Sequence, residues 1–185
     1  MSWSLGEIQA LTTKAARGAG HPWGVAEEAG WAVRWLSSFG LPGAEAMVSV
    51  LEDVGAKTCP ISLGIAVADT QNLSPANGVK ISHPLVLLPF LSRAARDGQI
   101  QIRIQDLVIH VARNGTDLNV TLLDHGILNV LMTAGARLRT PEFSRVYSIP
   151  KDALLRLERL AHLTYAPATE ASRISGAGAG LTDND

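Results

Sequence analysis

A strict alternation of polar and apolar residues is the feature that most constrains how this chain can fold. Residues 99–104 read Gln-Ile-Gln-Ile-Arg-Ile, and a second apolar run over 107–111 follows closely. Side chains alternate between the two faces of a β-strand, so this pattern predicts a strand with one buried face. Asn114-Gly115 then precedes a third such run over 118–122. Because both turn residues tolerate positive φ, the sequence predicts an antiparallel hairpin there.

Helical patterns lie on both sides of this strand-rich segment. Ser4 and Glu7 have the spacing of a capping box, in which each side chain satisfies a backbone N–H group of the other residue. Apolar residues recur every three or four positions in the first and the last of four predicted helices, as on the buried face of a helix. The second is predicted from glutamates in its first turn and from Gly40 as its C-terminal cap, and the third from Pro42 and Gly43 at its start. The predicted helices span about 5–17, 24–39, 43–54 and 150–165.

The middle of the chain is predicted to be mostly antiparallel sheet, over about 61–123. β-Branched residues are frequent at 61–67 and at 79–82, and Pro, Asn and Gly bound these runs. Residues 125–136 fit either a strand or a short helix. Helices that flank a block of strands, without repeated strand–helix–strand units, predict an α+β fold.

The length of 185 residues fits one domain of ordinary size, which we place at residues 1–165. The remaining segment, 166–185, is rich in small residues and predicts a Gly-rich tail. Two interpretations of this tail stay open. It is a solvated flexible end, or it folds over a pocket or reaches a neighbouring subunit, where glycines allow close backbone approach.

Charge and cysteine content restrict the classes of partner and compartment. The formal net charge of -1 offers no extended field for a phosphate backbone or an anionic membrane, so we expect neither nucleic acid nor membrane as a partner. The apolar run at 84–91 is far shorter than a membrane-spanning helix and is predicted to lie in the core. One cysteine and no recognisable targeting segment predict a cytoplasmic location.

The segment from Arg17 to Leu36 holds the densest group of candidate functional residues. A glycine-rich turn that leads into a helix can bind an anion with its free N–H groups. In this hypothesis Arg17 pairs with a substrate carboxylate, Gly18 and Gly20 let the backbone approach it, and Trp23 forms an apolar wall.

The proton-transfer candidates in the same segment are His21 and Glu28. Glu28 is preferred to Glu27 because helical spacing places it on the face of the tryptophans. Arg173 of the tail would complete the pocket as part of a lid. The alternative is purely structural: a tight connection between two helices, with Trp31 and Trp35 stacked on the buried face.

The other nucleophiles and imidazoles receive simpler interpretations. Asp124 and His125 are adjacent on a predicted strand and point to opposite faces, so only His125 remains a candidate. His83 and His110 are predicted to be packing residues, and His162 a surface residue on the last helix. Cys59 is expected to be a buried, inert thiol, because a nucleophile there would need a base from elsewhere in the fold.

No spacing typical of a zinc or iron site is present, so we expect no metal and no cofactor. The glycines at 176–180 follow a helix and end the chain, which argues against a dinucleotide fingerprint. Asp183 and Asp185 carry oxygen ligands, but an unanchored tail does not arrange them in advance.

The run from Lys14 to Leu36 resembles a bacterial family known as domain of unknown function number 3726, and the resemblance is clearest over residues 4–42. It implies a bacterial source and no reaction, cofactor or partner. Two functions remain open from the residues. One is a cytoplasmic enzyme or enzyme subunit acting on a small polar, carboxylate-bearing metabolite without a redox cofactor. The other is a non-catalytic interaction or accessory subunit, and self-association into a homo-oligomer is compatible with both.

Overall fold

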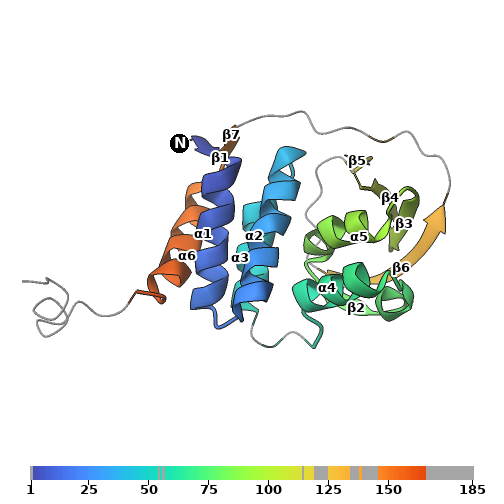
Figure 1. The fold of residues 1–185 in the computed structure, drawn as a ribbon, viewed down its shortest axis with the longest axis horizontal. Helices are drawn as coiled ribbons and strands as arrows, with labels where there is room; N and C mark the ends of the chain where they lie inside the picture. The colour runs from blue at the N-terminus through green and yellow to red at the C-terminus, as the bar shows by residue number, and fades with distance from the viewer. Residues whose placement is uncertain are drawn as a thin grey trace, which may run out of the picture.

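The computed structural model describes residues 2–53, 55, 57–113, 115–118, 125–133, 138 and 146–165. Within these ranges the fold is α+β, as the sequence predicts. Figure 1 shows a group of helices beside a second part that contains a sheet and further helices. No helix among the described residues is long and apolar enough to cross a bilayer.

Four helices form the first part and confirm the predicted helical segments. They are α1 (Leu5–Gly18), α2 (Trp23–Ser38), α3 (Gly43–Glu52) and α6 (Lys151–His162). The capping box at the start of α1 is present: Ser4 N donates to Glu7 Oε2 at 2.8 Å, and Glu7 N donates to Ser4 Oγ at 3.2 Å. It satisfies two N–H groups that a helix start otherwise leaves unpaired.

The last helix returns to pack on the first three. Glu52 of α3 accepts hydrogen bonds from Arg156 Nη2 and Arg159 Nη2 of α6, both at 2.6 Å. Gly18 of α1 lies against the backbone of Leu160, where a Cβ atom would overlap the Leu160 carbonyl oxygen. A short pair of antiparallel strands, β1 (Ser2–Ser4) and β7 (Val146–Ser148), lies beside this bundle.

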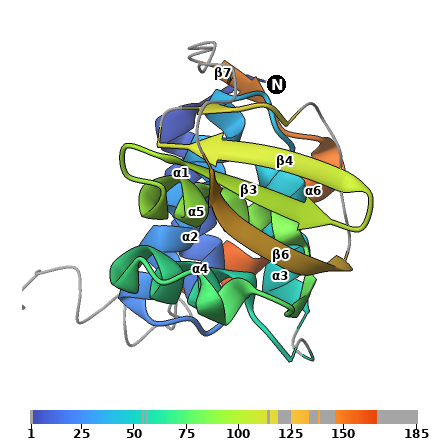
Figure 2. The same ribbon diagram turned by 90° about the vertical axis from the view of Figure 1, so that its right-hand side faces the viewer.

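The second part is built on an antiparallel sheet with the strand order β2-β6-β3-β4-β5. Its strands are β2 (Lys80–Ser82), β3 (Gln99–Ile104), β4 (Leu107–Ala112), β5 (Gly115–Thr116) and β6 (His125–Thr133). The predicted alternation is confirmed, since Ile100 and Ile102 are fully buried and Ile104 is 1% exposed. Figure 2 shows β3, β4 and β6 in front of the helix α5 (Leu88–Ala94), which packs on the inner face.

The predicted antiparallel hairpin corresponds to β4 and β5, where Ala112 pairs with Gly115 and Val111 with Thr116, so Gly115 begins a strand instead of lying in the turn. Asn114 itself and residues 119–124 lie outside the described residues. The longer hairpin joins β3 to β4 through Gln105 and Asp106. For residues 125–136, the strand alternative holds over β6 and 134–136 lie outside the described residues.

One predicted strand is wrong. Residues 61–67 lie in a helix, α4 (Pro60–Thr70), despite their β-branched side chains. The buried positions Pro60, Ile61, Gly64 and Val67 recur every three or four residues, and proline suits the first turn of a helix. Gly64 faces the ring of Phe90, so packing against α5 outweighs the weak local preference for strand.

Two short 3₁₀ helices complete the described elements, η1 (Ser74–Ala76) and η2 (Pro84–Leu87). The apolar run at 84–91, predicted to lie in the core, forms η2 and the start of α5, and every residue in it is buried. Its 3₁₀ helix η2 contacts both α3 and α4. A cavity opens near this junction.

Candidate functional site

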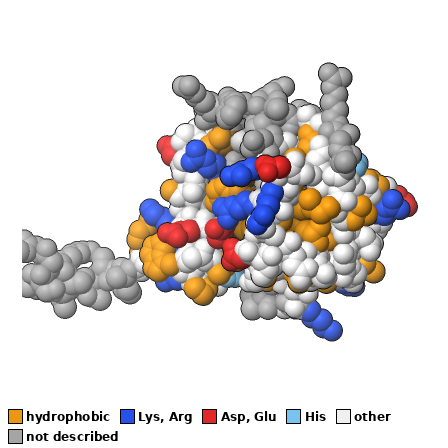
Figure 3. All heavy atoms as spheres, turned by 45° about the vertical axis from the view of Figure 1, so that its right-hand side comes forward, with side chains coloured by type: hydrophobic (Ala, Val, Ile, Leu, Met, Phe, Trp, Pro, Cys, Tyr) orange, Lys and Arg blue, Asp and Glu red, His pale blue; other side chains and the backbone are white. Residues whose placement is uncertain are grey.

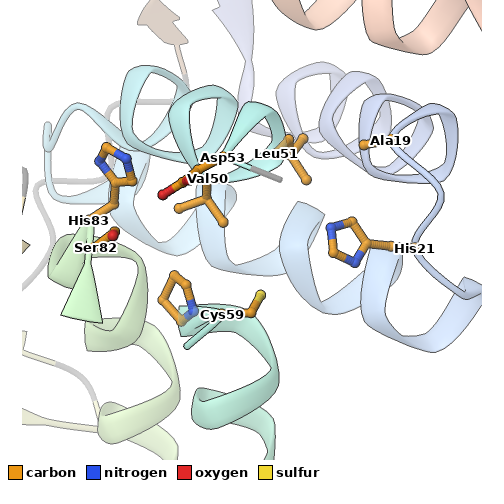
Figure 4. A pocket seen from close by; sticks show the side chains of 9 residues that line it. Ala19, His21, Val50, Leu51, Asp53, Cys59, Ser82 and His83 are labelled. Atoms are coloured by element: carbon orange, nitrogen blue, oxygen red, sulfur yellow. The ribbon is translucent and has the colours of Figure 1, made fainter. Parts of the chain in front are cut away.

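A cavity of about 250 Å³ lies where the helical bundle meets the second part of the fold. It opens between the turn from α1 to α2, the end of α3, the start of α4 and the end of β2 (Figure 4). Its lining residues are Ala19, His21, Val50, Leu51, Asp53, Cys59, Pro60, Ser82 and His83. Two imidazoles, a thiol, a carboxylate and a hydroxyl thus share one small apolar-walled space.

His21 is fixed by the backbone of the turn between α1 and α2. Its carbonyl oxygen accepts a hydrogen bond from Arg17 Nη1 at 2.6 Å, and its N–H group donates to the Ala16 carbonyl oxygen at 3.1 Å. Gly20, with φ of 93°, permits the left-handed step that this turn requires. Burial lowers the pKa of the His21 imidazole below its ordinary value of 6.5, so the ring is neutral at neutral pH and can accept a proton.

Cys59 lies at the opposite wall as a free, partly exposed thiol. It is the N-cap residue of α4, where the partial positive charge of a helix start favours an anionic group. Figure 4 shows the Cys59 sulfur turned toward the end of the cavity that holds His21. The fold therefore places this thiol and a potential base, far apart in the sequence, in the lining of one cavity.

His83 occupies the other end of the cavity, with Ser82 and Asp53 (Figure 4). Its backbone has φ of 50° and ψ of 55°, the left-handed region. This conformation costs a residue other than glycine about 1 kcal/mol, and a residue before proline ordinarily avoids helical angles. Backbone strain of this kind collects at functional sites, so the strain at His83 directs attention to this cavity.

The sequence comparison now adds a family assignment to this geometry. A family model described as "Protein of unknown function (DUF3726)" matches residues 3–116, more than half of the chain. The chain belongs to this family. No curated protein and no solved structure matches this chain. The segment that matches the DUF3726 family contains every residue that lines the cavity.

Of the predicted site residues that the structure describes, only His21 lines the cavity of this DUF3726 member. Arg17 instead holds the backbone of the turn, and its guanidinium lies 4.9 Å from the ring centre of Trp23, which is 64% exposed. Gly18 packs on α6 and Gly20 shapes the turn. The structure thus places these residues in the connection between α1 and α2 and in its packing on α6.

Glu28 lies away from the cavity. Its Oε2 atom accepts a 2.6 Å hydrogen bond from Arg93 Nη1 of α5, and the Arg93 guanidinium lies 3.4 Å from the ring centre of Trp31. Trp31 also makes an edge contact with Phe90, with ring centres 5.9 Å apart. These contacts assign Glu28 to the packing of α2 on α5.

The remaining predictions have varied outcomes. The stacking of Trp31 on Trp35 is replaced by the contact with Phe90 and by a contact of Trp35 with Phe39, with ring centres 4.5 Å apart. His162 is exposed on α6. Arg173 and Asp124 lie outside the described residues, as does the tail over 166–185.

His110 is held rather than simply packed. Its Nδ1 atom lies 2.7 Å from Asp117 Oδ2, and its backbone N–H group donates to Asp117 Oδ1, also at 2.7 Å. Across the part of the chain that the structure describes, no three His, Cys, Asp or Glu side chains form a group that could hold a metal ion.

Sequence reasoning missed Cys59, His83, Asp53 and Ser82 as members of one site. A usable signal existed at Cys59-Pro60, because proline at the first helical position marks the residue before it as an N-cap. His83 precedes a proline, which predicts an extended backbone rather than the left-handed one found. Neither signal reveals that the two residues face the same space.

Proposed function

We propose that this chain is a cytoplasmic enzyme, or a subunit of one, that binds a small polar metabolite in the cavity and acts on it with Cys59 and His21. The observation that carries the proposal is the meeting of the single thiol of the chain with two imidazoles in a space of about 250 Å³. Small-molecule sites are concave and largely apolar, with a few convergent polar groups.

The chemistry follows from the two side chains. A neutral imidazole can take the proton of a thiol, and the resulting thiolate is the reactive nucleophile. Burial keeps His21 neutral near pH 7, which is the form that accepts a proton. Val50, Leu51 and Pro60 form an apolar part of the cavity wall.

The opposite end of the cavity supports binding of the polar part of the substrate. Ser82 offers a hydroxyl, His83 an imidazole and Asp53 a carboxylate. The strained backbone of His83 directs its ring to this end, so we assign it to positioning the substrate rather than to proton transfer. A reduced thiol is maintained in the cytoplasm, which agrees with the proposed location.

The test is a thermal-shift screen of the purified protein against small bacterial metabolites. A compound at about a hundred times its dissociation constant adds about 2.7 kcal/mol of stability, which is several degrees for a domain of this size. We expect one compound class to stabilise the parent protein and His162→Gln, whose substitution lies outside the cavity. We expect the His83→Gly protein to lose the shift. An equal shift in the His83→Gly protein would contradict the proposal.

A second candidate function, an interaction or accessory subunit, is supported by the outer face of the sheet. Val108 is 40% exposed, Leu131 49% and Ile127 55%. In the view that brings the sheet side forward, hydrophobic side chains gather at the surface (Figure 3). Exposed apolar patches are typical of contact sites with other proteins or with a second copy. This candidate is tested by sedimentation of the parent protein and of Leu131→Lys. It requires that the parent self-associates or co-purifies with another protein, and that Leu131→Lys loses this association.

A further inference from the structure

A second cavity adjoins the thiol cavity. It measures about 380 Å³ and lies between the connection from α3 to α4 and the edge strand β2. Asp53 and Ser82 line both cavities, so the two spaces meet at these residues. A ligand that fills one can therefore extend into the other.

Two lysines give the second cavity its character. Lys57 precedes Cys59 by two positions in the connection from α3 to α4, and Lys80 begins β2. Because Ile81 is buried, strand alternation places Lys80 and Ser82 together on the opposite face. The hydroxyl of Thr58 is a further donor in the lining.

The charges of this cavity do not cancel. Lys57 and Lys80, both exposed, line the cavity together with one carboxylate, that of Asp53, so the lining carries an excess positive charge. Among the described residues, neither lysine forms a salt bridge. A lysine on an edge strand also discourages pairing with strands of other molecules, and this role can explain Lys80. It does not explain Lys57, because Lys57 lies outside any strand.

We infer that the Lys57–Lys80 cavity binds the anionic group, a phosphate or a carboxylate, of the metabolite whose reactive part lies at Cys59. The inference rests on the proposed function, and it narrows the substrate class to anionic metabolites. Lysine is a common ligand of phosphate and carboxylate, which it holds as a point charge. The shared lining residues let one molecule contact both the lysines and the thiol.

The first experiment measures binding of inorganic phosphate and of acetate by titration calorimetry. The proteins are the parent, Lys57→Gln/Lys80→Gln and the control Lys14→Gln/Lys151→Gln. Loss of two charges should weaken binding of the preferred anion about tenfold, while the control keeps the parent affinity. The anion that binds more tightly identifies the group. Equal affinity in the parent and Lys57→Gln/Lys80→Gln, or no binding of either anion, would overturn the inference.

The second experiment links the lysines to the thiol. Iodoacetate and iodoacetamide alkylate the one cysteine of the chain and differ mainly in charge. The ratio of their rates at Cys59 should fall about threefold in Lys57→Gln/Lys80→Gln at low salt, and added salt should remove the difference. An unchanged ratio overturns the link between the two cavities. The rate with neutral iodoacetamide reports on His21 and Cys59 alone, so failure of the proposed function is recognised separately.

Discussion

Arg17 Nη1 donates a 2.6 Å hydrogen bond to the carbonyl oxygen of His21. The arginine that the sequence suggests as a substrate ligand thus holds the backbone of the histidine that lines the cavity. Trp23 covers the guanidinium, with 4.9 Å between the Arg17 Cζ atom and the ring centre. The turn between α1 and α2 is therefore a support for His21, and the chemistry we propose lies on the side of the turn that faces Cys59.

Gly18 should be required for packing rather than for binding. A methyl group there would overlap the carbonyl oxygen of Leu160, which belongs to the backbone of α6 and cannot turn aside. We expect Gly18→Ala to lower the free energy of unfolding by about 2 kcal/mol, as overpacked substitutions do. The matched control is Gly24→Ala in α2, where a Cβ atom meets nothing within 4 Å. Urea denaturation measures the free energy of unfolding of both variants, and equal stability of Gly18→Ala and Gly24→Ala would contradict this account of Gly18.

Glu28→Gln should leave the reactivity of Cys59 unchanged, because the Glu28 carboxylate pairs with Arg93 outside the cavity. The two side chains are 30% and 38% exposed, so solvent screens the pair. Loss of the charge should cost about 0.5 kcal/mol of stability. The rate at which iodoacetamide alkylates Cys59 checks the reactivity, and the midpoint of urea denaturation checks the stability. Slower alkylation in Glu28→Gln would make Glu28 a catalytic candidate again.

His83→Gly should separate stability from function. Glycine relieves a left-handed backbone strain of about 1 kcal/mol and loses a similar amount through its greater freedom in the unfolded chain. The net change in unfolding free energy should stay below about 1 kcal/mol, while metabolite binding is lost. Gln105→Gly is the control, since Gln105 has φ of 53° in the exposed turn between β3 and β4. It should retain metabolite binding.

Glu45 should make stability depend on pH. Burial raises the pKa of its carboxyl above the ordinary value of 4.5, although Tyr147 Oη donates a 3.4 Å hydrogen bond to Oε2. The folded protein therefore holds this proton more tightly than the unfolded chain. Its stabilising contribution is full below pH 4.5 and is lost as the pH rises through the raised pKa.

Glu45→Gln removes this ionisation and keeps an oxygen for Tyr147. We expect the variant to be more stable than the parent at pH 7 and equally stable at pH 4, as measured by thermal unfolding at both values. Glu27→Gln, at an exposed position of α2, serves as the control. An advantage for Glu45→Gln that is the same at both pH values would be inconsistent with a raised pKa.

The sequence predicts the helical part well because its signals are local. The capping box of Ser4 and Glu7 and the spacing of apolar residues depend only on near neighbours. Residues 61–67 mislead because the burial of Gly64 against Phe90 decides their structure, and these residues are far apart in the sequence. Likewise, the turn at Gln105 and Asp106 lacks the glycine or asparagine that marks a hairpin.

The site is only partly predictable for the same reason. His21 stands out beside a glycine-rich turn, and among the described residues it is the one predicted site residue that lines the cavity. Cys59 and His83 belong to different elements, and their approach depends on how α4 and β2 pack on the bundle. Periodicity and spacing carry no information on such contacts between distant segments.

The most direct test of the central claim is the rate at which iodoacetamide alkylates Cys59 across pH 5 to 9 in the parent, His21→Gln and His162→Gln. If His21 takes the proton of the thiol, His21→Gln should slow alkylation at pH 7 by about tenfold or more, toward the range typical of general-base catalysis. The exposed His162→Gln control should follow the parent. Identical pH profiles for the parent and His21→Gln would show that the imidazole and the thiol do not act together.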